Sequence, residues 1–176
     1  IILVIGIRES AYFNSAMVVL KIVILAFFVG VGFTYVRPEN WHPFSPGGWS
    51  GIQAGAAIIF FSYIGFDAVS TAAEETRNPK RDLPIGLIAS LVICTFIYIL
   101  VAAVLTGMLP SSQLNTAEPL AKAFSANHIN WAAGIISLGS VVATTAVLLV
   151  FQLGQPRILF SMSRDGLLPR YFGRVH

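Results

Sequence analysis

The sequence predicts an all-α integral membrane protein, and three observations carry this prediction. Hydrophobic residues make up 56% of the 176 residues and charged residues only 11%, whereas a soluble domain carries about 25% charged residues. Several apolar segments are long enough to cross about 30 Å of hydrocarbon as helices, which takes roughly 20 residues. The basic residues gather in alternate connections between these segments. A helix satisfies its own backbone groups in lipid, and none of the segments alternates as barrel strands do.

The apolar segments divide the chain into one transmembrane domain over 1–176. The short apolar stretch at 1–7 resembles neither a span nor a signal peptide, so we expect it to end a helix whose beginning is missing. The sequence is therefore expected to be truncated at both ends. A short segment around 120–124 fits an interfacial helix. Membrane helices are expected at 15–36, 51–75, 84–109 and 131–162.

Basic residues distinguish the two sides of the predicted spans. Arg37 and Lys122 lie on one side, and Lys21 lies within a span. The positive-inside rule places the more basic side in the cytoplasm, which predicts cytoplasmic loops at 8–14, 74–83 and 157–176. The net charge of +3 then reports topology, and we expect no nucleic-acid partner. The more basic side carries the other eight basic residues, which are Arg8, Arg77, Lys80, Arg81, Arg157, Arg164, Arg170 and Arg174.

Polar residues within the spans are the candidate functional positions. A charge at bilayer depth is costly, so Lys21 is a candidate functional group unless it snorkels to the nearby interface. Gly65 followed by Asp67 fits a broken transporter helix whose free carbonyls bind substrate, although glycine also serves close helix packing. The hydroxyls of Thr144 and Thr145 either serve an ion or lysine, or bond to carbonyls one turn back.

Enzymatic motifs are not apparent in the sequence. It has no Cys/His cluster with metal-ligand spacing, no phosphate-binding glycine loop followed by lysine, and no plausible Ser/His/Asp set. We therefore expect no enzyme activity, no cofactor and no metal site.

Two long motifs carry a resemblance to a known family. They read FFSYIGFDAVSTAAEE at 60–75 and NPKRDLPIG at 78–86, with further matches at 154–157, at 162–169 and from Phe13-Asn14 into Lys21. The chain resembles the amino acid–polyamine–organocation superfamily, in particular its bacterial cationic amino acid transporter branch. The resemblance covers the chain from the end of that family's fourth helix to its eighth. It implies the five-plus-five inverted-repeat transporter fold, with the sixth helix broken.

The resemblance also assigns roles to residues. It implies that the backbone carbonyls of Phe61 and Ile64 accept the substrate's α-amino group at the break that Gly65 permits. The side chains of Phe61 and Phe66 would then wall the pocket, with Asp67 near the substrate or gate. Lys21 would take the place of a sodium ion in a proton-coupled transporter. Its expected contacts on the eighth helix are Thr144 and Thr145.

These roles predict secondary active amino-acid transport, coupled to protons by alternating access. Exchange of amino acids or polyamines on the same fold stays open, as does a channel subunit, although no charged ring or filter segment is evident. The expected partners are an amino acid, protons, the bilayer and the family's helices 1–3 and 9 onward. The resemblance places the protein in a bacterial plasma membrane.

Overall fold

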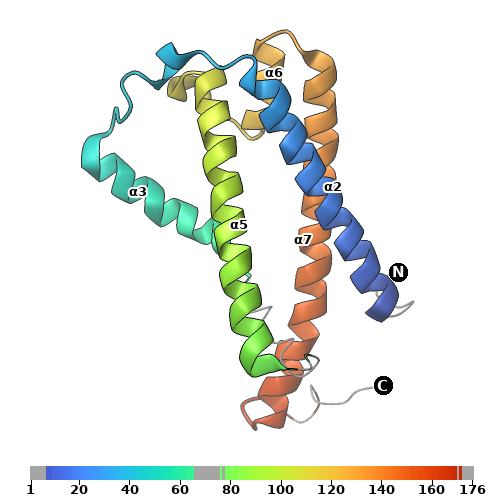
Figure 1. Ribbon diagram of the computed structural model, residues 1–176. Coiled ribbons are helices and arrows are strands. Elements are labelled where there is room, and N and C mark those ends of the chain that lie inside the picture. Colours follow the sequence, from blue (N-terminus) through green and yellow to red (C-terminus); the bar gives the residue numbers. More distant parts are fainter. Residues whose placement is uncertain (1–6, 66–75, 77, 170, 172–176) are drawn as a thin grey trace.

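The computed structural model describes residues 7–65, 76, 78–169 and 171. All regular elements in these ranges are helical, which confirms the all-α fold class. Long helix α2 packs against both α5 and α7, and Figure 1 shows α3 apart from these three helices, with its C-terminal end directed toward α5. In chain order the elements are α2 (Ile7–Phe33), η1 (Pro38–Trp41), α3 (Gly48–Phe60), η2 (Phe61–Tyr63), α5 (Pro79–Met108), η4 (Ser111–Gln113), α6 (Pro119–Ala126) and α7 (Asn130–Arg164).

Three of these helices are long and apolar enough to cross a membrane. They are Tyr12–Phe33 within α2, Pro79–Met108 and Asn130–Arg164. Even the shortest, with 22 residues, is about 33 Å long at 1.5 Å per residue, which matches the hydrocarbon thickness. Most of their side chains are exposed. Exposed apolar helices of this length define an integral membrane protein.

Helix boundaries differ from the sequence expectations mainly where a helix leaves the apolar region. Residues 8–14 form the first turns of α2 and are not a loop. α5 begins at Pro79 because proline suits the first helical position, so 79–83 is helical as well. α7 continues through Pro156 to Arg164, which makes 157–164 helix rather than loop. Hydrophobicity marks membrane depth, whereas a helix can extend beyond it into water.

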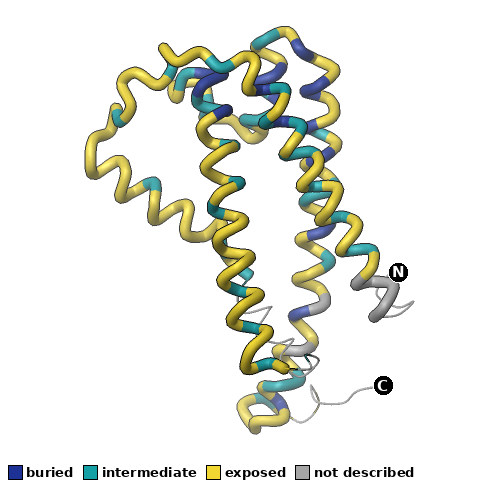
Figure 2. The backbone as a smooth tube through the Cα atoms, in the orientation of Figure 1, coloured by how far each residue is buried: buried dark blue, intermediate teal, exposed yellow. Residues whose placement is uncertain are grey.

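The buried core lies at the end of the bundle that carries α6 (Figure 2). Phe28 of α2 and Phe124 of α6 are fully buried, and their rings meet edge to face with centroids 5.4 Å apart. Gly32 allows α2 to lie against α5, because a Cβ there would come within 2.6 Å of Val104. α6 therefore packs against the spans and covers one end of the core. This helix is the one expected around 120–124.

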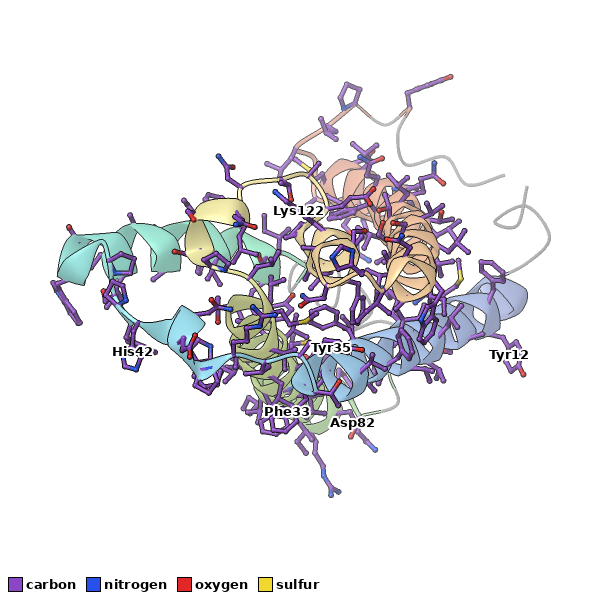
Figure 3. The ribbon with its side chains drawn as sticks, turned by 90° about the horizontal axis from the view of Figure 1, so that it is seen from above. Tyr12, Phe33, Tyr35, His42, Asp82 and Lys122 are labelled. Atoms are coloured by element: carbon purple, nitrogen blue, oxygen red, sulfur yellow. The ribbon has the colours of Figure 1, made fainter. Side chains whose placement is uncertain are left out.

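The described charges divide between the two ends of the bundle. The start of α5, with Lys80 and Arg81, lies at the same end as Arg164 in α7 (Figure 1). Arg37, in the connection after α2, and Lys122, in α6, lie at the other end. Figure 3, seen from the Lys122 end, shows α3 extending away from the bundle of α2, α5 and α7. The helix directions therefore match the uneven charge distribution.

Candidate functional site

The second apolar segment is interrupted, and the interruption contains three of the predicted substrate residues. α3 ends at Phe60, and residues Phe61–Tyr63 form a single 3-10 turn. Ile64 is then extended, with ψ 135°, and Gly65 has φ +135°. Few residues other than glycine adopt such a φ. The helix therefore stops within Phe61–Gly65, while Phe66 and Asp67 lie outside the described residues.

Backbone groups in the interruption are only weakly used by the chain itself. The Ile64 N–H donates to the Phe61 carbonyl over 3.4 Å, which is long for an N–H···O bond. A carbonyl oxygen has two lone pairs, so the Phe61 oxygen retains acceptor capacity. The side chains of Phe61 and Ile64 are 68% and 56% exposed, and no described residue covers most of their surface. This arrangement can accept a cationic donor such as an ammonium group.

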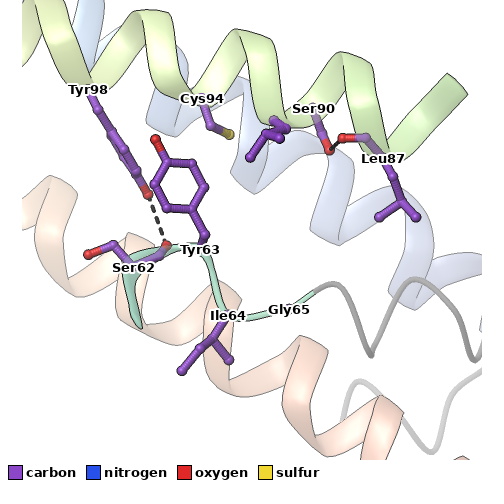
Figure 4. A pocket seen from close by; sticks show the side chains of 9 residues that line it. Ser62, Tyr63, Ile64, Gly65, Leu87, Ser90, Cys94 and Tyr98 are labelled. Atoms are coloured by element: carbon purple, nitrogen blue, oxygen red, sulfur yellow. Dashed lines mark hydrogen bonds between the residues drawn. The ribbon is translucent and has the colours of Figure 1, made fainter. Parts of the chain in front are cut away.

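Helix α5 holds the interruption through residues that the sequence analysis did not single out. Tyr98 donates a hydrogen bond to the Ser62 carbonyl oxygen over 3.2 Å (Figure 4). The Tyr63 and Thr95 hydroxyl oxygens lie 3.0 Å apart. The available signal was the spacing of Leu87, Leu91, Cys94 and Tyr98, which places them on one face of a helix. A cavity of about 170 Å³ lies along this face, lined by Ser62, Tyr63, Ile64, Gly65, Leu87, Ser90, Leu91, Cys94 and Tyr98.

Lys21 occupies a separate place, in the seam between α2 and α7. It is half-buried and lines a cavity of about 170 Å³ together with Ser140 and Ala143 of α7. The surroundings are otherwise apolar and include Leu120 of α6. Gly139 brings the helices close, because a Cβ there would lie 2.8 Å from Ile24. The fold therefore presents Lys21 to α7 at the level of Ser140.

Thr144 and Thr145 directly follow Ala143 in α7, but they are not among the residues that line this cavity. The Thr144 hydroxyl donates to the Ser140 carbonyl at 2.9 Å, and the Thr145 hydroxyl donates to the Val141 carbonyl at 2.8 Å. Both therefore make the bond one turn back that the sequence analysis left open as an alternative. The α7 side chains that line the Lys21 cavity are instead those of the preceding turns. A role for the two threonines in coupling stays a prediction.

Asn14 of α2 is a polar residue to which the sequence alone assigned no role. Its Oδ1 is buried without a hydrogen-bond partner, and it precedes Lys21 by seven residues, or about two helical turns. The two side chains thus lie on the same face of α2. Within the described ranges, no group of three His, Cys, Asp or Glu side chains comes together to hold a metal.

The three membrane-length helices, together with the interrupted apolar segment before α5, define a polytopic membrane protein. A family model described as amino acid permease matches residues 1–176. The chain belongs to the amino acid permease family, which confirms the resemblance found in its motifs.

Curated relatives from bacteria and plants align with nearly all of this chain. It is 47% identical over 176 residues to the branched-chain amino acid permease of Bacillus subtilis, covering 99% of the chain and 38% of the relative. The methylthioribose transporter of Bacillus subtilis is 47% identical over 171 residues, covering 97% and 37%. Cationic amino acid transporter 9, chloroplastic, of Arabidopsis thaliana is 46% identical over 171 residues, covering 97% and 30%. The chain thus spans well under half the length of these relatives.

Proposed function

We propose that this chain belongs to a secondary amino-acid transporter that binds the substrate's α-ammonium group at the Phe61–Gly65 interruption. The observation that carries the proposal is the backbone there, which passes from a 3-10 turn through extended Ile64 to Gly65 at φ +135°. Carbonyls freed from a helix in a membrane protein are suitable acceptors for an ammonium donor. Membership in the amino acid permease family supports the same reading. Phe61, Ile64 and Gly65 form the described part of this site, and Phe66 and Asp67 would complete it.

The residues beside the interruption also bear on the charge of the substrate's side chain. The described side chains that line the cavity beside the interruption are uncharged, and they include Leu87, Leu91 and Tyr98. A charged substrate side chain buried among them would lack a partner, which costs several kcal/mol. We therefore place neutral amino acids ahead of cationic ones. The relatives' names include branched-chain and cationic amino acids, so both classes belong in a substrate panel.

We assign proton coupling in this proposal to Lys21. A lysine charge at bilayer depth costs roughly 2.5–3.5 kcal/mol, and Lys21 faces the mostly apolar cavity between α2 and α7. The Ser140 hydroxyl lines the same cavity and offers a hydrogen-bond acceptor to the Lys21 ammonium group. Binding and release of a proton would then change the charge between these helices during alternating access. Thr144 and Thr145 would assist after a shift of α7.

A second candidate is exchange of one solute for another on the same site, including solutes other than amino acids. The relative named as a methylthioribose transporter is as similar in sequence as the branched-chain amino acid permease. Exchange and symport differ in whether uptake needs solute on the far side. The charge distribution supports placing the Lys80, Arg81 and Arg164 end in the cytoplasm for either candidate.

The deciding experiment is uptake of labelled amino acids into proteoliposomes that contain the full-length protein. An inward proton gradient should drive accumulation, and Lys21→Met should abolish its pH dependence. Lys122→Met is the matched control, because Lys122 bonds to the Gln113 carbonyl and is not among the residues that line the Lys21 cavity. It should leave coupling intact.

Three other results would change the conclusion. Gradient-driven uptake that survives Lys21→Met would remove Lys21 from coupling. Uptake only into vesicles preloaded with solute would establish exchange. No uptake of any amino acid by folded protein would reject the proposed substrate class, and polyamines and methylthioribose would be assayed next.

A further inference from the structure

Tyr98 lies in α5 and reaches across to the backbone of the interruption. Its hydroxyl donates to the Ser62 carbonyl oxygen at 3.2 Å, over a separation of 36 residues in sequence. Ser62 is the middle residue of the 3-10 turn, between Phe61 and Tyr63. Backbone carbonyls within a membrane need donors when the helical ladder ends. α5 therefore supplies a side-chain donor at the point where α3 stops.

A second bond runs between the same two segments. Thr95 donates its only hydroxyl hydrogen to the Leu91 carbonyl at 2.8 Å. The Tyr63 hydroxyl, 3.0 Å from the Thr95 oxygen, must therefore be the donor in that pair. The rings of Tyr63 and Tyr98 also meet edge to face, with centroids 5.3 Å apart and an interplanar angle of 71°. Figure 4 shows the two rings together between α5 and the turn.

These contacts fix the turn at two successive residues. Thr95 and Tyr98 are three positions apart, so they share one face of α5. Tyr98 holds the backbone at Ser62, and Thr95 holds the side chain of Tyr63. Two anchors restrict both translation and rotation of the turn. The carbonyls of Phe61 and Ile64 lie immediately before and after the anchored residues.

We propose that Tyr98 and Tyr63 are positioning residues that hold the interruption against α5 and so orient the Phe61 and Ile64 carbonyls toward the substrate's ammonium group. The proposal rests on the function proposed above. Tyr98 donates to the Ser62 carbonyl, and the backbone held there sets the direction of the carbonyls on either side of the anchored residues. Neither tyrosine hydroxyl contacts the ammonium; both act through the backbone of the turn.

The test compares Tyr98→Phe and Tyr63→Phe in the full-length protein, because both substitutions keep the ring and remove only the hydroxyl. Each should raise the KM for uptake about 5- to 10-fold, which corresponds to one lost hydrogen bond, with kcat nearly unchanged. Trp41→Phe is the matched control. It removes a different side-chain bond to α5, from Trp41 Nε1 to the Ala103 carbonyl at 3.3 Å, and it should leave KM unchanged.

A second measurement does not depend on transport. Hydrogen–deuterium exchange, read by mass spectrometry on peptides that cover the Phe61–Gly65 turn, should become several-fold faster in Tyr98→Phe. Trp41→Phe should leave exchange in that turn unchanged. The turn is thus monitored even if the substrate is not an amino acid.

The two measurements separate the possible failures. Unchanged KM and unchanged exchange in both tyrosine variants would overturn the positioning role. A KM increase of equal size in Trp41→Phe would also overturn it, because general loosening of α5 would then suffice. Faster exchange in Tyr98→Phe, together with no amino-acid uptake by the wild-type protein, would support the anchored turn and reject the proposed function.

Discussion

The side-chain amide of Asn40 donates a hydrogen bond to the backbone carbonyl of Gly107 at 2.7 Å, across 67 residues of sequence. The same carbonyl accepts the Arg37 backbone N–H at 2.9 Å. Gly107 lies in the last turn of α5, where carbonyls have no helical partner. The loop after α2 thereby provides the C-terminal cap of α5 and ties the two spans together.

Asn40→Ala should lower stability by about 1 kcal/mol, the usual net contribution of one hydrogen bond. The Gly107 carbonyl keeps its bond from Arg37, which limits the loss. The measurement is the thermal midpoint of the detergent-solubilised protein. Asn115→Ala is the control, because Asn115 is exposed in the connection after α5. Equal midpoints for the two variants would argue against this cap.

Gly139→Ala tests the close approach of α7 to α2 beside Lys21. A Cβ at position 139 would lie 2.8 Å from Cγ2 and 2.9 Å from Cδ1 of Ile24, so the isoleucine or the helices must shift. We expect a loss of about 1–3 kcal/mol from overpacking. The matched control is Gly134→Ala on the same helix, where nothing lies within 4 Å of the added methyl. The control should be neutral or slightly stabilising, since alanine favours helix.

Thermal melting of the two variants decides this prediction. A midpoint for Gly139→Ala that equals or exceeds that of Gly134→Ala would mean that the seam accommodates the methyl. Uptake assays on the same proteins would report whether the Lys21 cavity is affected. We expect weaker transport for Gly139→Ala alone.

The sequence was most informative where hydrophobicity and backbone chemistry act locally. Apolar length predicted the spans that became α5 and α7, and Gly65 marked the place where the apolar segment before α5 is interrupted. Helix ends in water were misplaced, as at Ile7 and Pro79, because hydrophobicity does not continue beyond the bilayer. Local geometry also decided that Thr144 bonds to its own helix.

Contacts between helices were less accessible to sequence reasoning. Composition indicates that α5 is buried in lipid or protein, but it does not say which turn of α5 faces the interruption. The Tyr98–Ser62 bond depends on that rotation and on the angle at which α3 leaves the bundle. The same holds for the α7 residues around Lys21: the cavity beside it is lined by Ser140 and Ala143, and its contacts with Thr144 and Thr145 stay a prediction. If one helix slides along its neighbour by one turn, the hydrophobic pattern of each helix stays the same, so the sequence does not reveal which residues meet.

Gly65→Ala tests the interruption through backbone conformation alone. Gly65 has φ +135°, while nothing lies within 4 Å of a Cβ added there. The substitution is therefore disfavoured by the backbone, at a cost of about 1–3 kcal/mol, and not by a steric clash with neighbours. The strain is relieved if the turn moves toward a helical or extended conformation, which would displace the Ile64 carbonyl. We expect substrate KM to rise by at least 5-fold, measured by uptake into proteoliposomes.

Gly86→Ala is the matched control for this prediction. Gly86 lies within α5, and an added Cβ there also has nothing within 4 Å, but its backbone is helical. The control should keep the wild-type KM and gain up to about 1 kcal/mol of stability. If Gly65→Ala transported with the wild-type KM, the positive φ would be incidental to binding, and the carbonyls of the turn would lose their proposed role. If both variants raised KM equally, the effect would belong to α5 packing instead of the interruption.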